Sequence, residues 1–349
     1  PSPELHGKII GFESVVSVVH RGGGIYRRLG IRASDGRTHW FLVAVDSYST
    51  MARDDRLCRL FNTLNTFVFS CDHNCNRRNA SINATKTVAL TNSVRLIGDH
   101  PMNLSFGDRE GLRGGDVGNE DDWMVEYCKS RVSSFEDLYA IQKGFAGSLA
   151  FNSLMQYLFS ACKSADDLVF NIGNGSVSST GLVVEFNDAG QLASRSSPFF
   201  FSSSVQKMLG EQNINGRFAM CFSSFATVLY NRSQSLLPVL ELLLRDEMAA
   251  KYKEGRGGKK GLKDNDGELE EKVVMCANKI IVRTGRCSIV DCSTADGSLP
   301  SGGGRRKLKK GEVDCAVFEL INLAKGGNGN GNGNGNGNGG GKNGGKSWI

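Results

Sequence analysis

The chain has 349 residues, 40% of them hydrophobic and 22% charged, which is enough apolar material to bury a large core. No apolar run reaches membrane-spanning length, and no charged-then-apolar signal region opens the sequence. These features argue against a membrane protein and against a disordered one. We expect a soluble globular segment that makes no membrane contact.

The net charge of +6 raises the question of nucleic-acid binding, so the location of the charge matters. Residues 251–263 and 305–310 each carry a net charge of +5, which leaves −4 for the rest of the chain. Both stretches contain or adjoin glycines, as flexible loops do. We therefore expect no direct nucleic-acid contact by the folded core. The second stretch is equally compatible with a nuclear import signal and with a solvated loop.

Ten cysteines at irregular spacing in a chain this long favour a reducing compartment over a disulfide framework. The segment Cys71-Asp72-His73-Asn74-Cys75 is the one cluster that looks like a metal site. Zinc requires about four ligands, and no second pair stands at a supportive spacing. We expect a polar loop with free thiols there, with neither metal nor cofactor.

The first hundred residues predict a sheet followed by a helix. Residues 9–19, 25–32 and 39–45 are β-branched or aromatic stretches separated by turn residues, which indicates an antiparallel meander. A helix is predicted to start at Asp54 and to pack one face on the meander. Its apolar positions are Leu57, Leu60, Phe61, Leu64 and Phe67/Val68.

A strand and a long helix dominate the next part. Residues 85–90 indicate a strand, 92–101 a connector and 104–131 an exposed loop rich in Gly, Asp and Glu. Apolar residues recur at three- and four-residue steps over 135–161, which predicts a buried central helix.

The remainder is predicted to be mostly helical. Residues 168–172 and 180–186 indicate a hairpin. Residues 288–311 form a loop-like basic insert, and the Gly/Asn tract from 326 lacks the apolar groups needed to offset the entropy cost of ordering. Further helices are predicted at 205–209, which Gly210 ends, and at 216–230, 235–251 and 269–282.

Several segments of the chain carry a resemblance to a known family. They are residues 26–32, 34–37 and 41–43, residues 53–65, residues 94–97, and Ser197-Pro198-Phe199-Phe200-Phe201. In this order they resemble a strand pair, the N-lobe helix, the connector and the end of the activation segment in the kinase region of phosphatidylinositol 3-kinase-related proteins. This resemblance implies an α+β, two-lobed, protein-kinase-like fold of the phosphatidylinositol 3-/4-kinase type, with a small β-rich N-lobe and a larger helical C-lobe.

The implied domains follow from that layout. Residues 1–97 would form the N-lobe and 98–284 the C-lobe. Residues 285–325 would hold the basic insert and a short C-terminal helix, and 326–349 a disordered Gly/Asn-rich tail.

The run 239–248 is similar to the Leu-Arg-Asp-Glu helix of one branch of that family, the transformation/transcription domain-associated (TRRAP) proteins. The resemblance implies a nuclear, chromatin-associated scaffold. Its partners would be the subunits of a histone acetyltransferase complex, as a transcription coactivator, together with transcription activators.

Phosphoryl transfer requires a strand lysine for the phosphates, a catalytic aspartate, and an asparagine and a second aspartate for magnesium. By resemblance these positions fall at Asp46, Lys163, Leu168 and Glu185. A carboxylate at the first position repels phosphate. All five histidines lie at or before residue 100, so the catalytic Asp-Arg-His loop has no counterpart. We expect a pseudokinase.

Other residues offer weaker routes to nucleotide chemistry. Asp166-Asp167 has the oxygen ligands for magnesium, but an exposed turn is the commoner role of such a pair. Glu185 could ligate a metal, but without its partners it would hold one weakly. Arg21-Gly22-Gly23-Gly24 leads into a strand, so a turn is favoured over a phosphate cradle.

Two alternatives remain. In the first, the chain is a diverged active Ser/Thr or lipid kinase in which Lys163 or Arg53 replaces the phosphate-binding cation. In the second, it is a diverged gene product or a fragment with interaction activity alone, since its Gly/Asn tract departs from the usual family terminus, of which Trp348 would be a remnant.

Overall fold

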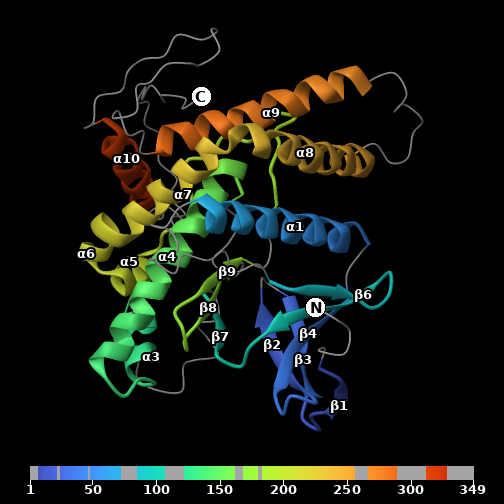
Figure 1. The fold of residues 1–349 in the computed structure, drawn as a ribbon, viewed down its shortest axis with the longest axis vertical. Helices are drawn as coiled ribbons and strands as arrows, with labels where there is room; N and C mark the ends of the chain where they lie inside the picture. The colour runs from blue at the N-terminus through green and yellow to red at the C-terminus, as the bar shows by residue number, and fades with distance from the viewer. Residues whose placement is uncertain are drawn as a thin grey trace, which may run out of the picture.

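The computed structural model describes residues 7–21, 24–45, 48–71, 85–106, 122–161, 168–179, 183–255, 266–288 and 312–327. Within these ranges the chain forms a β-rich lobe and a larger helical lobe (Figure 1). A small second sheet lies beside the helices. The expected two-lobed α+β architecture is confirmed.

The first sheet has the strand order β1-β3-β4-β6-β5, with β2 also paired to β3. The predicted stretch 9–19 splits into two strands, and the predicted connector 92–101 contains β6, a central strand. The connector prediction fails because β6 is defined by its pairing with β4. Ile97 lies opposite Leu42, and both are buried. The strands are β1 (Ile9–Phe12), β2 (Ser17–Arg21), β3 (Gly24–Ala33), β4 (Thr38–Val45), β5 (Thr87–Ala89) and β6 (Val94–Asp99).

Helix α1 (Tyr48–Cys71) begins before the predicted Asp54 and lies between the first sheet and the helices (Figure 1). It contacts β5, but also α7 (Ala219–Asn231) and α8 (Ser233–Gly255). The prediction that its apolar face packs on the meander is wrong, because those side chains join the core of the helical lobe. They are Leu57, Leu60, Phe61 and Leu64.

The second sheet has the order β7-β8-β9, comprising Asn103–Ser105, Leu168–Asn171 and Val177–Ser179. The predicted hairpin exists, but its second strand lies earlier than expected. The turn between β8 and β9 is short, because Gly175 adopts a φ of 73° and its N–H donates to the carbonyl of Asn171 at 2.8 Å.

The predicted loop 104–131 is wrong over its last third. It contains α3 (Trp123–Lys129), which buries Trp123, Met124 and Cys128. The apolar residues of this short helix lie too close together for a clear helical period. Residues 107–121 lie outside the described part of the chain.

The helical lobe is built around α4 (Phe135–Phe159), whose Ser134 side chain accepts a hydrogen bond from the Asp137 N–H at its N-terminus. From Phe145 onward α4 is buried almost all round, as predicted, whereas Phe135 is exposed. The predicted helix 216–230 starts with a π-helical turn. The other elements are α5 (Ser203–Leu209), α6 (Glu211–Asn213), η4 (Ile214–Phe218), α9 (Asp266–Cys287) and α10 (Glu312–Gly327).

Several predictions concern residues outside the described ranges. These are the segment 72–75, most of the first basic stretch, all of the second and the tract beyond residue 327. Among the helices that are described, none combines the length and apolar character needed to cross a membrane.

Candidate functional site at the junction of the two lobes

An ion-pair cluster, here called the Glu247 cluster, joins α1 to α8. Arg53 Nε donates to Glu247 Oε2 at 3.0 Å, and Arg56 Nη2 donates to Glu247 Oε1 at 2.6 Å. Glu247 is 4% exposed. Each carboxylate oxygen therefore has its own guanidinium, which compensates the cost of burying the charge.

The sequence contains a signal for this cluster that was missed. Glu247 follows Leu240, Leu243 and Leu244 at the three- and four-residue spacing of a buried helix face. A carboxylate in such a face requires a cation. The arginines sit three residues apart on α1, so they reach the same side.

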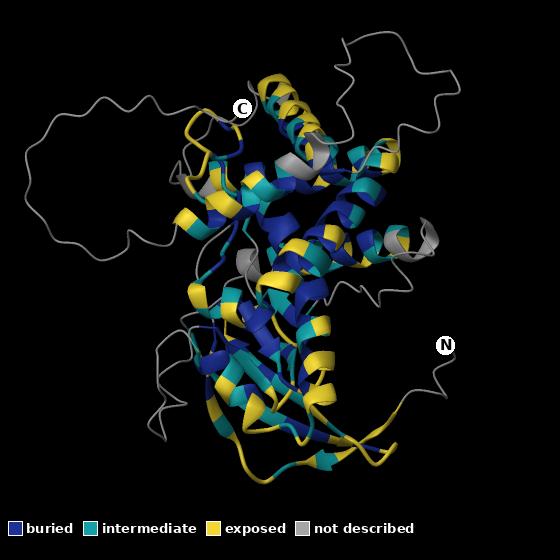
Figure 2. Ribbon diagram, turned by 90° about the vertical axis from the view of Figure 1, so that its left-hand side faces the viewer, coloured by how far each residue is buried: buried dark blue, intermediate teal, exposed yellow. Residues whose placement is uncertain are grey.

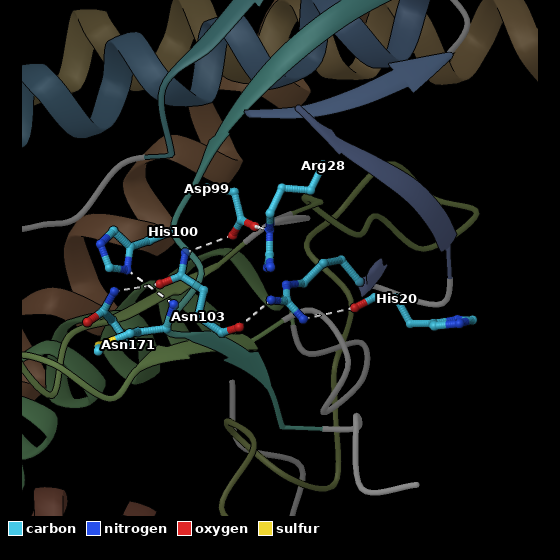
Figure 3. A network of polar contacts seen from close by, with 8 residues as sticks. His20, Arg28, Asp99, His100, Asn103 and Asn171 are labelled. Atoms are coloured by element: carbon cyan, nitrogen blue, oxygen red, sulfur yellow. Dashed lines mark hydrogen bonds and ion pairs between the residues drawn. The ribbon is translucent and has the colours of Figure 1, made fainter. Parts of the chain in front are cut away.

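A second polar network, the connector network, links the first sheet to the second (Figure 3). Asp99 at the end of β6 accepts from Arg28 Nε of β3 at 2.7 Å and from Asn103 Nδ2 of β7 at 2.9 Å. Asn103 Oδ1 accepts from Asn171 Nδ2 of β8 at 2.7 Å. The Asp99 side chain is only 3% exposed, so these bonds are shielded from water.

Arg21 adds another link between the same elements. It is 3% exposed, and its guanidinium donates to the backbone carbonyl of Asn103 and, at 3.0 Å, to that of His20. Arg21 therefore binds β7 at Asn103. The turn predicted at residues 21–24 is not tested, because Gly22 and Gly23 lie outside the described ranges.

One face of α4 holds the second sheet through buried polar side chains. Ser148 Oγ accepts from the Val177 N–H at 2.8 Å, and Asn152 Nδ2 donates to the Val177 carbonyl at 3.1 Å. One helical turn further on, Gln156 Oε1 accepts from the Phe200 N–H at 2.9 Å. These bonds satisfy backbone groups at the end of the hairpin and in the predicted activation segment.

The predicted activation-segment end is packed into an aromatic cluster. Phe199 and Phe201 are fully buried. Their ring centroids lie 5.8 Å from each other, and that of Phe201 lies 5.4 Å from Phe218 in η4. Ring pairs at such distances contribute beyond simple area burial, so this segment is fixed by its own side chains.

The predicted kinase positions fall in different settings. Leu168 is 1% exposed in β8 and pairs with Ser179 across the hairpin. Glu185 forms an ion pair with Arg195. No hydrogen bond or ion pair joins these two described positions, whereas Asp46, Lys163 and Asp166-Asp167 lie outside the ranges that the structure describes.

The described residues contain no group of three or more His, Cys, Asp or Glu side chains suited to a metal ion. Burial also raises the pKa of the Cys128 and Cys287 thiols to about 12. A protonated thiol is a poor metal ligand and a poor nucleophile. These two cysteines therefore belong to the core.

No protein-family model matches the sequence, and no curated protein is similar enough to count as a match. Solved structures do match. Structures of the "FAT and kinase domain of CtTel1" and of the "Complete CtTel1 dimer with C2 symmetry" each superpose with a TM-score of 0.61, at 14% and 13% identity respectively. An open conformation of CtTel1 matches with a TM-score of 0.60.

Each of these matches covers 93% of this chain, but only 23% of the chain of the FAT and kinase structure and 12% of the two others. At this identity the likeness shows the fold alone. CtTel1 is a phosphatidylinositol 3-kinase-related protein, and the chain has the kinase-like fold found in it.

Proposed function

We propose that the chain is a catalytically inactive kinase-fold module of a TRRAP-like scaffold, positioned in the nucleus within a histone acetyltransferase complex. Its role would be to hold protein subunits and to receive transcription activators. On this proposal it binds neither a nucleotide nor a metal ion.

The observation that carries the proposal concerns the position predicted for the magnesium-binding asparagine. Leu168 stands there, has no ligand atom, and is 1% exposed in the core. The predicted metal-binding carboxylate, Glu185, is neutralised by Arg195. Phosphoryl transfer needs both metal ligands. To supply them, the chain would need a ligand side chain in the buried strand β8 and a Glu185 carboxylate released from Arg195.

The geometry also supports a structural role for the junction. The charges of the Glu247 cluster are used in contacts between α1 and α8, and Asp99 joins β3 of the first sheet to β7 of the second. Arg53, the replacement cation in the active-kinase alternative, donates to Glu247. A scaffold benefits from such a fixed junction, whereas many kinases move their lobes during turnover.

Nucleotide binding tests the inactive assignment. Titration of the full chain with a fluorescent ATP analogue and magnesium should give no saturable binding up to about 1 mM. Magnesium-dependent binding in the micromolar range that Asp46→Ala abolishes would contradict the proposal and support the active-kinase alternative. A radiolabelled-phosphate transfer assay would then identify protein or lipid as the acceptor.

The scaffold assignment needs its own experiment. Tagged full chain recovered from nuclear extract should bring acetyltransferase activity with it, and Glu247→Gln should reduce the amount recovered. Recovery without any acetyltransferase activity would remove the coactivator part of the proposal while leaving the inactive assignment standing.

A further inference from the structure

A cavity of about 360 Å³ lies where α4, α9 and α10 approach one another. Residues 194–198 close it from a fourth side, and Figure 1 shows α10 lying across the end of α9. Three arginines line this cavity, namely Arg195, Arg283 and Arg286. None of its lining residues belongs to the Glu247 cluster or to the connector network.

Arg283 is held rigidly at the base of the cavity. Its Nη1 donates to the carbonyls of Tyr157 and Leu158 at 2.9 and 3.1 Å and to Ser160 Oγ at 2.8 Å. The guanidinium also lies over the Tyr157 ring, 5.5 Å from its centroid. These contacts cap the C-terminal end of α4 and fix the guanidinium, so its Nε and Nη2 groups keep one orientation.

The positive charge in the cavity is only partly balanced. Arg195 pairs with Glu185, but in the described part of the chain neither Arg283 nor Arg286 forms an ion pair. Burial lowers the pKa of Arg283, and the neighbouring Arg286 lowers it further. Bringing an anion between the two guanidiniums relieves both effects.

The opposite side of the cavity is apolar and carries one opposing charge. Leu320 and Leu323 of α10 line it together with Glu319, an exposed carboxylate. The hydroxyls of Ser194 and Ser196 lie on the loop side and add hydrogen-bond donors. The volume falls in the range of small-molecule sites, and convergent polar groups facing an apolar wall are typical of such sites.

We propose that this cavity binds a phosphate monoester that carries an apolar substituent. The phosphate would lie against Arg283 and Arg286, which match its oxygens by charge and by fork geometry. The substituent would lie against Leu320 and Leu323. This inference goes beyond the scaffold function and does not depend on it.

Calorimetric titration of the full chain with phenyl phosphate tests the site. One molecule should bind per chain, more tightly than inorganic phosphate because the ring contacts the leucines. Arg286→Gln should weaken the binding of phenyl phosphate about tenfold, because it removes one charge-assisted hydrogen bond. Arg286 is exposed and forms no ion pair within the described part of the chain, so its replacement should leave the fold intact.

Two further variants separate the site from general charge effects. Glu319→Gln should tighten binding by about threefold, since it removes a repulsive carboxylate, and misfolding does not produce a gain. Arg59→Gln, which removes the same charge from an exposed site on α1, should leave the affinity unchanged. No heat at about 10 mM phenyl phosphate, or equal weakening by the two arginine variants, would overturn the proposal.

A phosphotyrosine peptide and its dephosphorylated form distinguish the two possible sources of the phosphate, a protein segment and a small molecule. A peptide containing phosphotyrosine that binds more tightly than phenyl phosphate, and loses binding when dephosphorylated, identifies a phosphorylated protein segment as the ligand. A peptide that binds no better than phenyl phosphate identifies a small phosphate ester.

Discussion

The two lobes differ sharply in how they are stabilised. The helical lobe contains one continuous hydrophobic core, whereas the buried cluster of the first sheet consists of Val19, Leu42, Ala44 and Ile97. The same sheet leaves Ile10 71% and Val18 63% exposed. Figure 2 shows the contrast, with buried residues concentrated among the helices.

This difference indicates that the β-rich lobe depends on its partner. An isolated sheet with so small a core buries too little apolar area to offset its conformational entropy. Contacts across the junction supply the rest, through α1, the Glu247 cluster and the connector network. Breaking those contacts should therefore damage the sheet more than the helices.

The largest effect is expected for Glu247→Gln, which leaves Arg53 and Arg56 without their buried carboxylate. Removing one partner of a buried ion pair costs about 3–5 kcal/mol. Urea denaturation should show this loss of unfolding free energy, with the sheet unfolding before the helices. Glu270→Gln is the matched control, because its pair with Arg245 is half exposed, and it should lower the free energy of unfolding far less. Equal losses in the two variants would contradict the dependence of the sheet on the junction.

A change inside the helical lobe sharpens the comparison. Gly175→Ala would place a Cβ 2.0 Å from the Ile141 carbonyl oxygen of α4 at a positive φ. We expect the free energy of unfolding, measured by heat or urea, to fall by about 2–3 kcal/mol. The first sheet should then unfold together with the helices and not before them. Gly210→Ala has a φ of 72° but open space around it, so it measures backbone strain without a clash and should cost about 1 kcal/mol.

A moderate effect is expected for Asp99→Ala in the connector network. Arg28 and Asn103 would each lose a shielded acceptor, at a cost of about 1–3 kcal/mol. Hydrogen exchange should become faster in β3, β7 and β8 and remain slow in α4. Unchanged exchange in β3 would mean that the network does not hold the sheet. Glu126→Ala, which removes an exposed pair with Lys129, serves as the control.

The smallest effect concerns pH and belongs to the helical core. Burial raises the pKa of Cys128 from 9.0 to about 12, so in the unfolded chain the thiol loses its proton first. The contribution of this thiol to the free energy of unfolding is therefore fully present below pH 9. It falls between pH 9 and 12, by at most about 1.4 kcal/mol per pH unit. Urea midpoints from pH 8 to 10 should fall less steeply in Cys128→Ala. An unchanged slope would contradict this.

The sequence predicts the elements with strong periodicity and misses those set by long-range pairing. Helix α4 and the later helices are predicted because their apolar residues repeat over several turns. The pattern of residues 92–101 indicates a connector and not strand β6, because the pairing of β6 with β4 leaves no local pattern. The face on which α1 packs was assigned wrongly because an amphipathic pattern does not identify its partner.

The same limit applies to the site. The predicted kinase positions follow from resemblance, and the sequence places Leu168 and Glu185 but not the Arg195 that neutralises one of them. The sequence contains a signal for part of the Glu247 cluster, because an acidic residue in an apolar helix face requires a cationic partner. Which arginines supply it depends on the crossing of α1 and α8, and that crossing is a property of the folded core.

The separation of Arg53 and Glu247 by 194 residues along the chain has a consequence for synthesis. Helix α1 leaves the ribosome long before α7 and α8 exist, and at 5–20 residues per second the delay is about 10–40 s. During that interval the apolar face of α1 lacks the partners that α7 and α8 provide in the folded chain. We therefore expect newly made chains to require a chaperone until α8 has emerged, and the β-rich lobe to mature last although it is made first.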